Sequence, residues 1–562
     1  MIDEESCAAP LSSPRGEMCE KAASVQDCCL TSASPTCHRM MDEFIPRPPT
    51  EDEIKDLPHV MTNIPITAWL LVFIGSAAAF ARYGVSTTFR TLYRPNVSYY
   101  LTRPENYIQN PPGNPQLPGA LGLGQAKATT ITSIFSAFVF LTPLPLGIIS
   151  DGWLGRYRTM ILSLGLLLLG YTILIATAAP ASFRHGSSLG GLIASMLLIG
   201  LGQGGLSAVM FVFIGDQIPD TEMIVQKTPK EKFVIEDRSI SIQFVFNIYF
   251  WATNLASLSI IGTTMMERVS FWSAYLMPTG ILAISIIPLL LWSSRLTRPR
   301  LQKNVLPETL RVVYITCRNR FRLSAAVQAH QCDSVFVDEL RSGLNACQVM
   351  IAFVIFWLCY NQIFSNIVSQ AGQMERVGVS NDTIVFLNVA AVVVLSPLIQ
   401  SLQALLRRHR LSFGPIRRIT VGFVLTAMAM AYAAGLQKLI YSRGPCYSRP
   451  LDCSGAYQNG HLRPNKVNVW LQAPIHVLLG AGEILAYVSM TEYAYALSPQ
   501  NMKAVIQALN QLTVALGSAL CTALGPASRD PWLVTLYSCL SGVMGLGALL
   551  FWLVFRRYDN RE

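Results

Sequence analysis

The sequence repeats one feature along almost its whole length: apolar runs of about twenty residues or more, each long enough to cross the ~30 Å hydrocarbon core of a membrane as a helix. Of 562 residues, 51% are hydrophobic and only 14% are charged, whereas soluble domains carry about 25% charged residues. We therefore predict twelve membrane-spanning helices, at residues 66–90, 120–149, 157–179, 187–215, 240–263, 270–293, 345–366, 383–405, 416–440, 468–497, 503–525 and 532–555.

Basic residues lie on one side of these predicted spans. Arginines and lysines cluster at 295–322, 407–418 and 556–557, in connections that all face the same way if the spans number twelve. Positively charged connections stay in the cytoplasm, so both termini are predicted to be cytoplasmic, most simply at the plasma membrane. Because topology accounts for the formal charge of +10, we expect the lipid bilayer, and no nucleic acid, as its partner.

The predicted outer loops carry signs of an extracellular face. Sequons begin at Asn96 and Asn381, where glycosylation is chemically possible. Cys446 and Cys453 lie close together in "RGPCYSRPLDCSG", and an oxidising face favours a disulfide there. No CxxC pairs with a second CxxC or with HxxxH, so we expect no metal site.

The chain divides into segments of different composition. A polar stretch without apolar periodicity suggests a disordered cytoplasmic tail, and two groups of six spans flank a basic connection that contains the amphipathic stretch "PETLRVVYITCRNRFRL". We predict an all-α membrane protein, most simply a monomer, in which two six-helix halves bind a substrate between them, as in major facilitator transporters. The predicted segments are 1–60 (tail), 61–293 (first half), 294–344 (linker), 345–556 (second half) and 557–562 (C-terminus).

Six stretches together resemble the fungal branch of the proton-dependent oligopeptide transporter family within that superfamily. Two of them are "NIYFWATNLASLS" (247–259), similar to the family's fifth-span signature, and "LPLGIISDGWLGRYRTM" (144–160), similar to the loop between spans two and three. The resemblance covers about residues 50–556, and the remaining stretches are 118–138, 200–217, 356–374 and 482–509.

The resemblance implies alternating access and a cytoplasmic gate. In the loop between spans two and three, an acid and the basic residues after it form a latch around a tight glycine turn. Here those positions hold Asp151, Arg156 and Arg158, with the turn at Gly155.

The first span departs from the family pattern. The family has Glu-x-x-Glu-Arg-Phe there, whose charges link transport to the proton gradient. Aligned on Phe80, Tyr83 and Gly84, this chain has Gly75 and Ala78 in place of the acids, and Ala79 in place of the arginine. Ser207 replaces a fourth-span lysine, and Arg82 replaces a tyrosine. Proton coupling is therefore an open question, because neither glycine nor alanine can bind a proton.

Two charged residues within the spans are the main site candidates. A charge at mid-membrane costs on the order of 3 kcal/mol, so it points to function. Glu483 matches the family residue that holds a substrate's amino terminus, and it could also carry the proton; alternatively, it only fixes helix packing by pairing with Arg82 or a hydroxyl. Arg82 either binds a substrate carboxylate, replacing the missing anchor, or extends to the outer interface.

Neutral residues complete the predicted pocket. Asn254 and Asn388 match family positions that contact a peptide backbone, which suits an amide that both donates and accepts. The aromatic candidates have an alternative role as packing or membrane-anchoring side chains. The further substrate-binding candidates are Tyr83, Tyr249, Trp357 and Gln362.

The sequence thus predicts a secondary transporter of small peptides or peptide-like compounds, with protons as a second partner left open. One alternative is a transporter of a peptide-derived secondary metabolite, by uniport or export. Another is a nutrient receptor that binds without transport. No HExxH, nucleophile elbow or pair of catalytic acids is present, so we expect no enzymatic activity and no cofactor.

Overall fold

The computed structural model describes most of the chain and divides it into two compact units. The smaller unit combines residues 1–64 with 218–242, and the larger combines 65–217 with 243–562. The described residues are 48–89, 124–179, 182, 188–220, 223–227, 233–267, 271–299, 334–375, 381–409, 413–450, 457–458, 461–462, 464–499 and 502–557.

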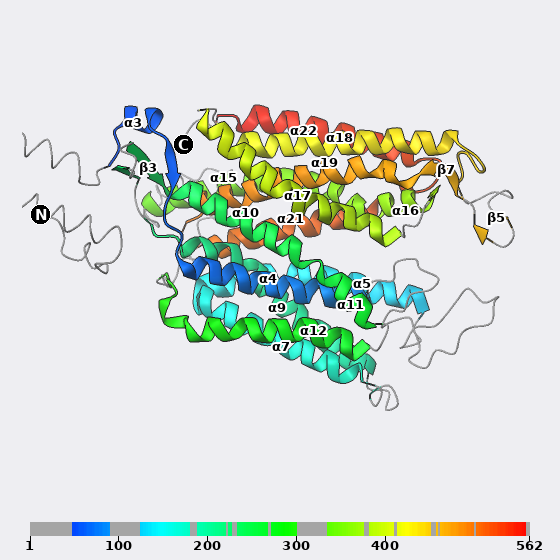
Figure 1. The fold of residues 1–562 in the computed structure, drawn as a ribbon, viewed down its shortest axis with the longest axis horizontal. Coiled ribbons are helices and arrows are strands. Elements are labelled where there is room, and N and C mark those ends of the chain that lie inside the picture. Colours follow the sequence, from blue (N-terminus) through cyan, green and yellow to red (C-terminus); the bar gives the residue numbers. More distant parts are fainter. Residues whose placement is uncertain are drawn as a thin grey trace, which may run out of the picture. The chain divides into compact units, whose positions relative to one another are not determined.

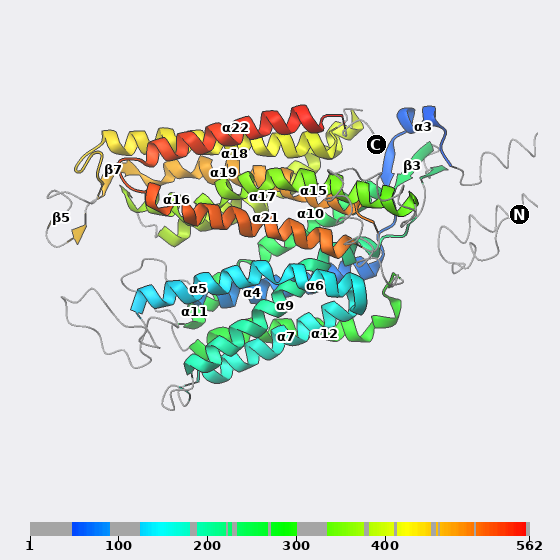
Figure 2. The same cartoon turned by 180° about the vertical axis from the view of Figure 1, so that it is seen from behind.

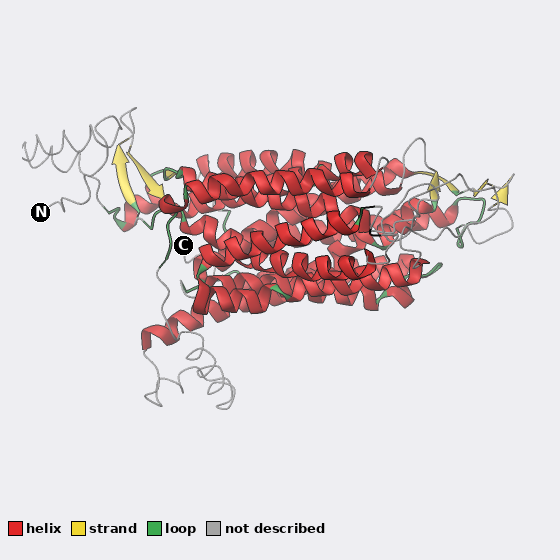
Figure 3. Ribbon diagram, turned by 90° about the horizontal axis from the view of Figure 1, so that it is seen from below, coloured by secondary structure: helices red, strands yellow, loops and turns green. Residues whose placement is uncertain are grey.

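The larger unit is built from long helices that run side by side (Figures 1 and 3). The described residues contain twelve helices long and apolar enough to cross a membrane, so the prediction of a twelve-span, all-α membrane protein is confirmed. The helices of the first half are α4 (Ile66–Phe89), α5 (Gly124–Leu141), α6 (Pro143–Ile149), η2 (Ser150–Leu154), α7 (Arg156–Thr177), α9 (Ser188–Asp216), α10 (Arg238–Ala256), α11 (Ser259–Glu267) and α12 (Phe271–Leu291).

The second half follows the same plan, with two of its spans interrupted. Span seven breaks at η4, and span ten contains a π-helical turn, η7, directly after Glu483. Its helices are α15 (Ser334–Tyr360), η4 (Asn361–Phe364), α16 (Asn366–Gly372), α17 (Asn381–Arg408), α18 (Pro415–Ser442), α19 (Ala473–Glu483), η7 (Ile484–Val488), α20 (Ser489–Leu497), α21 (Lys503–Ala523) and α22 (Leu533–Phe555).

Short elements complete the larger unit. They lie between spans or after them: η3 (Ser293–Arg295), η6 (Val469–Gln472), η8 (Gly525–Ala527), and the strand pairs β4 (Met374–Glu375) with β7 (Asn465–Asn468) and β5 (Tyr457–Gln458) with β6 (His461–Leu462). Since each span crosses the bundle, connections after odd-numbered spans lie at one end and connections after even-numbered spans lie at the other. We call the first the Cys446 end and the second the Gly155 end.

Small residues bring helices together in both halves. A Cβ at Gly202 of α9 would lie 2.7 Å from the Ser163 carbonyl oxygen of α7, too close for any side chain. In the second half, a Cβ at Gly482 of α19 would lie 2.9 Å from the Gly422 carbonyl oxygen of α18. Close backbone approach is the usual way in which membrane helices associate, and here it joins spans three and four and, equivalently, spans nine and ten.

Two predicted boundaries in the second half of the chain can be compared with the structure. The α15 helix begins at Ser334, eleven residues before the predicted start of span seven. The amphipathic stretch at 307–323 lies outside the described residues. The division at 294–344 therefore stays a prediction.

The smaller unit contains a three-stranded sheet that the sequence analysis did not anticipate. Its elements are α3 (Glu51–Asp56), β1 (His59–Met61), β2 (Ile224–Lys227) and β3 (Phe233–Asp237). The strand order is β1-β3-β2, with β1 parallel and β2 antiparallel to β3. Alternation along "FVIED" buries Ile235 completely.

The predicted disordered tail ends too late. Residues 1–47 lie outside the described residues, but 51–61 form α3 and β1. A capping box stabilises α3, because the Thr50 amide donates to Glu53 at 3.0 Å. The strand then gains its hydrogen bonds from β3, which is distant in sequence, so no local pattern could reveal it.

An ion pair crosses from β1 to β3. His59 Nδ1 lies 3.0 Å from Asp237 Oδ2, and Ser239 also donates to this carboxylate. The bond with Asp237 raises the pKa of His59 above its usual value, despite partial burial. Burial alone would raise the pKa of Asp237, but the hydrogen bonds from His59 and Ser239 outweigh it and lower that pKa.

We predict that this pair stabilises the small sheet most between about pH 4 and pH 6.5. The His59 contribution is complete below its unfolded pKa and is lost as the pH rises through the raised folded pKa. The Asp237 contribution is complete above its unfolded pKa and is lost as the pH falls through the lowered folded pKa. Hydrogen exchange of the β1 and β3 amides, corrected for intrinsic rates, should be slower at about pH 5.5 than at about pH 8.5. An unchanged difference in His59→Gln would contradict this assignment.

Candidate functional site

A buried acid lies at the middle of span ten. Glu483, 8% exposed, accepts a hydrogen bond of 2.6 Å from the Tyr360 hydroxyl of span seven. Asn388 of span eight donates to the same hydroxyl at 2.9 Å. Three spans of the second half thus meet at this carboxylate.

Arg82 lies on the opposing half, on α4. Its guanidinium carbon is 4.3 Å from the centre of the Tyr83 ring, and its buried Nε has no hydrogen-bond partner. Within the described part of the chain, Arg82 forms no ion pair. Arg82 is partly buried, and a partly buried cation without a carboxylate is costly, which is the condition expected of a site that receives an anion.

The two charges act on a common tyrosine. Tyr487, in the π-helical turn after Glu483, lies within electrostatic reach of both Glu483 and Arg82. Arg82 also reaches Tyr249 of α10. A positive group from the first half and a negative group from the second half therefore both interact electrostatically with one tyrosine.

Aromatic rings enclose this group. Tyr487 lies 5.5 Å from Trp357 and 6.2 Å from Phe211, measured between ring centres, and Phe211 lies 4.8 Å from Tyr249. The indole N–H of Trp357 is buried and has no acceptor. Apolar walls with a few unsatisfied polar atoms are typical of small-molecule sites.

The positions of the missing family charges are filled or buried. A Cβ at Gly75 would lie 2.5 Å from the Tyr249 ring and 2.7 Å from Met210, so an acid there would displace that ring. Ala78 and Ala79 are buried. Ser207 donates to the carbonyl oxygen of Gly204 in its own helix.

Two predicted pocket residues do not join the group. Gln362 donates to Leu358 O at 3.2 Å and Cys521 Sγ at 3.4 Å, and accepts from Asn366 at 2.6 Å, all within the second half. Asn254 donates to the carbonyl oxygen of Phe250 in its own helix, at 3.0 Å. The structure brings together Arg82, Tyr83, Tyr249, Trp357, Asn388 and Glu483 from the predicted set, and adds Tyr360 and Tyr487.

The predicted latch lies where the two halves meet at the Gly155 end. Asp151 accepts a hydrogen bond of 2.9 Å from the Val505 amide at the start of α21, in the other half. Arg156 lies 3.7 Å from Asp151 and donates to Asp216. Gly155, at φ 82°, permits the turn that places these side chains. Arg158 is exposed.

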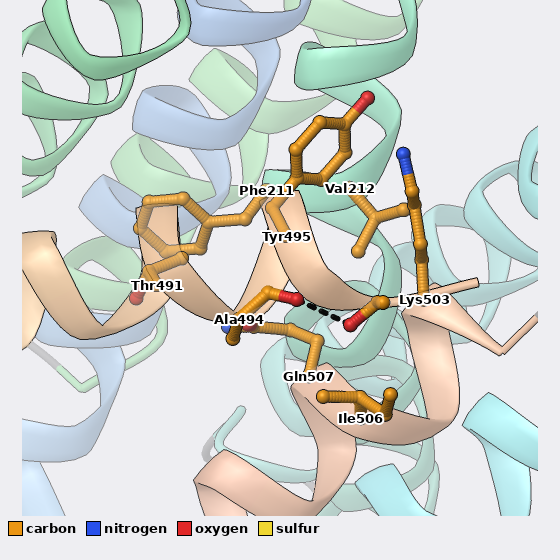
Figure 4. A pocket seen from close by; sticks show the side chains of 9 residues that line it. Phe211, Val212, Thr491, Ala494, Tyr495, Lys503, Ile506 and Gln507 are labelled. Carbon is orange, nitrogen blue, oxygen red and sulfur yellow. Dashed lines mark hydrogen bonds between the residues drawn. The ribbon is translucent and has the colours of Figure 1, made fainter. Parts of the chain in front are cut away.

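A second bond of the latch comes from span ten. The Tyr495 hydroxyl donates to Asp216 at 3.1 Å across the halves, and Lys503 Nζ lies 3.7 Å from the Tyr495 ring centre. These side chains border a narrow pocket between α9 and the helices α20 and α21 (Figure 4). Figure 2 shows α21 alongside α5 and α6, so the Gly155 end is closed.

The second half repeats this charge arrangement. Arg418, near the start of span nine, makes a two-pronged pair with Glu492 of span ten at 2.9 and 3.1 Å. Arg156 and Asp216 occupy the equivalent ends of spans three and four. Asp216, Tyr495 and Lys503 were not predicted as latch residues, although the charges of Asp216 and Lys503, each at the end of an apolar run, were a usable signal.

The remaining predicted sites lie at the edge of what the structure describes. Cys446 is disulfide-bonded, but Cys453 lies outside the described residues, so their pairing stays a prediction. Asn96 and the side chain of Asn381 also lie outside them. Among the described residues, no cluster of three or more His, Cys, Asp or Glu could hold a metal.

Comparison with known proteins assigns the chain to a class and then to a family. Its fold matches the crystal structure of the POT family transporter PepTSo, with a TM-score of 0.59 and 17% identity over 89% of this chain and 100% of that chain. The chain therefore shares the multi-pass helical fold of that structure.

Sequence comparison identifies the family. Residues 157–531 match the POT family model. The chain is 34% identical to Peptide transporter PTR_A of Candidozyma auris, over 92% of this chain and 86% of that protein. It is 32% identical to Peptide transporter PTR2 of Saccharomyces cerevisiae, over 92% and 83%. The chain belongs to the POT family.

We predict that Tyr495→Phe loosens the Gly155 end. The change removes the hydroxyl bond to Asp216 but keeps the ring beneath Lys503. A hydrogen bond to a charged group contributes about 1.5–3 kcal/mol, so a cysteine introduced at Ser498, in the pocket, should react with a thiol reagent about 10-fold faster. Tyr432→Phe is the matched control, because that hydroxyl bonds only Leu471, in its own half. Equal rates in both variants would contradict a latch.

Proposed function

We propose that this protein moves small peptides or peptide-like compounds across a membrane by alternating access between its two halves. The observation that carries the proposal is the pair of opposite charges, Arg82 of the first half and Glu483 of the second, which both act on Tyr487. A peptide at neutral pH carries a carboxylate at one end and an ammonium at the other. Such a substrate would satisfy both groups at once and join the halves.

Arg82 is the proposed carboxylate anchor. Its Nε is buried and unpartnered, and a guanidinium binds a carboxylate with two parallel hydrogen bonds. The stacked Tyr83 ring holds the guanidinium in place from one side. The charge that the family carries at the positions of Ala79 and Ser207 would thus be supplied from a neighbouring position of the first span.

Glu483 is the proposed partner of the substrate's amino group and the proposed proton carrier. Tyr360 and Asn388 orient its carboxylate without neutralising it. With no acid at Gly75 or Ala78, Glu483 is the titratable acid of the described central group. A proton bound here would neutralise the carboxylate and leave its carbonyl oxygen to accept a hydrogen bond from the ammonium, so that proton and peptide are bound together.

The proposed orientation has both termini and the Gly155 end on the cytoplasmic side of the membrane, which the positive connections support. The plasma membrane and a monomer are the simplest arrangement. The relatives named peptide transporters in Candidozyma auris and Saccharomyces cerevisiae support the substrate class.

We predict that Arg82→Ala lowers peptide affinity by roughly 100-fold or more, since each charge-assisted hydrogen bond contributes about 1.5–3 kcal/mol. The measurement is binding of labelled dialanine to purified protein, with unfolding temperature as the check on folding. Arg443→Ala, at an exposed arginine of the Cys446 end, is the control. Normal binding by Arg82→Ala would contradict the anchor.

We predict that vesicles containing the protein accumulate dialanine only under an inward proton gradient, and that Glu483→Gln abolishes accumulation. Equilibration without accumulation would identify a uniporter. Absence of any peptide movement would contradict the peptide assignment and favour a peptide-derived metabolite or a receptor.

A further inference from the structure

His476 lies buried in the outer half of span ten without a hydrogen-bond partner. Its side chain is on α19, seven residues before Glu483, and the residue is only 1% exposed. Neither ring nitrogen has a partner. A neutral imidazole offers one donor and one acceptor, and burying both unsatisfied costs free energy. Packing alone is therefore a poor explanation for a histidine here.

His476 shares one face of span ten with two groups already in use. Residues 472, 476, 480 and 483 repeat at helical spacing, so they form a stripe. At one end Gln472 donates to Gln370 Oε1 at 2.9 Å, and at the other Glu483 accepts from Tyr360. Both partners belong to span seven, so His476, between them, faces the same seam. It lies about 10 Å from Glu483 along the helix axis.

At Gly480, between His476 and Glu483, span eight packs closely against the stripe. A Cβ at Gly480 would lie 3.2 Å from Val392 Cγ2, 3.5 Å from Ala391 Cβ and 3.6 Å from Asn388 Oδ1, an atom that is itself buried and unpartnered. Gln472 Oε1 is likewise unpartnered. Unpartnered polar atoms therefore lie on the stripe at Gln472 and His476 and beside it at Asn388, which donates to the Tyr360 hydroxyl. We call this set the span-ten seam: Gln472, His476, Asn388, Tyr360 and Glu483.

A chain of amides extends the seam to the Cys446 end. Gln472 donates to Gln370, Gln370 to Gln437, Gln437 to Gln373, and Gln373 to the carboxylate of Asp530, with distances of 2.9, 2.8, 2.8 and 2.9 Å. Asp530 lies in the connection between spans eleven and twelve and is partly exposed. The hydrogen-bonded line thus runs from the Cys446 end to Gln472, which lies one helical turn before His476 on the same face.

The titratable groups along this line are few. Span seven contributes Tyr360, and span nine contributes Tyr441, which bonds Asp530, and Tyr432, which bonds Leu471. The described side chains of span eight, 387–406, include no acid or base, and those of 381–386 lie outside the described residues. Among the described side chains along the line from Asp530 to Glu483, the one imidazole belongs to His476.

We propose that His476 relays protons from the Cys446 end to Glu483. One ring nitrogen accepts a proton from a hydronium ion, whose O–H bond breaks to leave water as the N–H bond forms. The other nitrogen then gives up its proton, through a water molecule in the seam, to the Glu483 carboxylate, where an O–H bond forms. The ring returns to the neutral state as the opposite tautomer. This relay rests on the proposed proton coupling through Glu483.

The test compares two kinds of transport by reconstituted His476→Gln protein. Exchange of dialanine across vesicles at equal pH requires no net proton movement, so it should be unchanged. The initial rate of uptake driven by a proton gradient should fall about 10-fold or more, since a positioned proton carrier contributes at least that much. His409→Gln, the same change at an exposed histidine, should leave both rates unchanged.

The outcomes separate the relay from the coupling itself. Gradient-driven uptake at the normal rate in His476→Gln would overturn the relay alone. Exchange without accumulation by the unaltered protein would overturn both the coupling and the relay. A fall in both rates by the same factor would show a structural role and also overturn the relay.

A spectroscopic measurement on the unaltered protein covers the case in which the variant does not fold. Ile475–His476 is the only Ile–His pair in the sequence, so carbonyl-labelled isoleucine selects the backbone nitrogen of His476 by NMR, and carbon- and nitrogen-labelled histidine connects that nitrogen to the ring. The relay requires ring nitrogen signals of exchanging tautomers or of the protonated ring, and Glu483→Gln should change them. A single fixed neutral tautomer in both proteins would overturn the proposal.

Discussion

The absence of water from a membrane interior governs this structure. A buried polar group there must bond within the protein or remain unsatisfied at a cost. Most described hydroxyl and amide groups bond carbonyl oxygens of their own or neighbouring helices. Other described side chains keep an unpartnered polar atom, among them Arg82 and His476, and Glu483 keeps a carboxyl group at depth. Ionisable groups at this depth point to function, and the proposed substrate and proton sites rest on these three residues.

The two halves share one packing arrangement. Glycines let span three approach span four and let span nine approach span ten, and each pair carries one buried arginine–acid bridge at the Gly155 end. Only the first-half bridge also reaches the other half, through Tyr495. The repeated arginine–acid bridge therefore stabilises each half. The Tyr495 hydroxyl of span ten bonds the first-half bridge, so the closure of the Gly155 end depends on the position of span ten.

The change in the first span is a coordinated one. The space beside Gly75 contains the Tyr249 ring and Met210, so the lost acid has been replaced by packing rather than by a cavity. Positive charge has moved to Arg82, and the second-half acid remains. A site built in this way still fits a molecule with opposite charges at its ends, while any proton coupling has to pass through span ten.

The sequence by itself determined the spans, the two halves, the family and most of the charged candidates. Those properties depend on local composition and helical spacing, which a membrane makes unusually strict. The tertiary structure decided which candidates meet. It separated Gln362 and Asn254 from the central group, added Tyr360 and Tyr487, and paired β1 with a strand more than 170 residues away. Such contacts depend on helices and strands remote in sequence, and no local pattern encodes a partner that lies on another element.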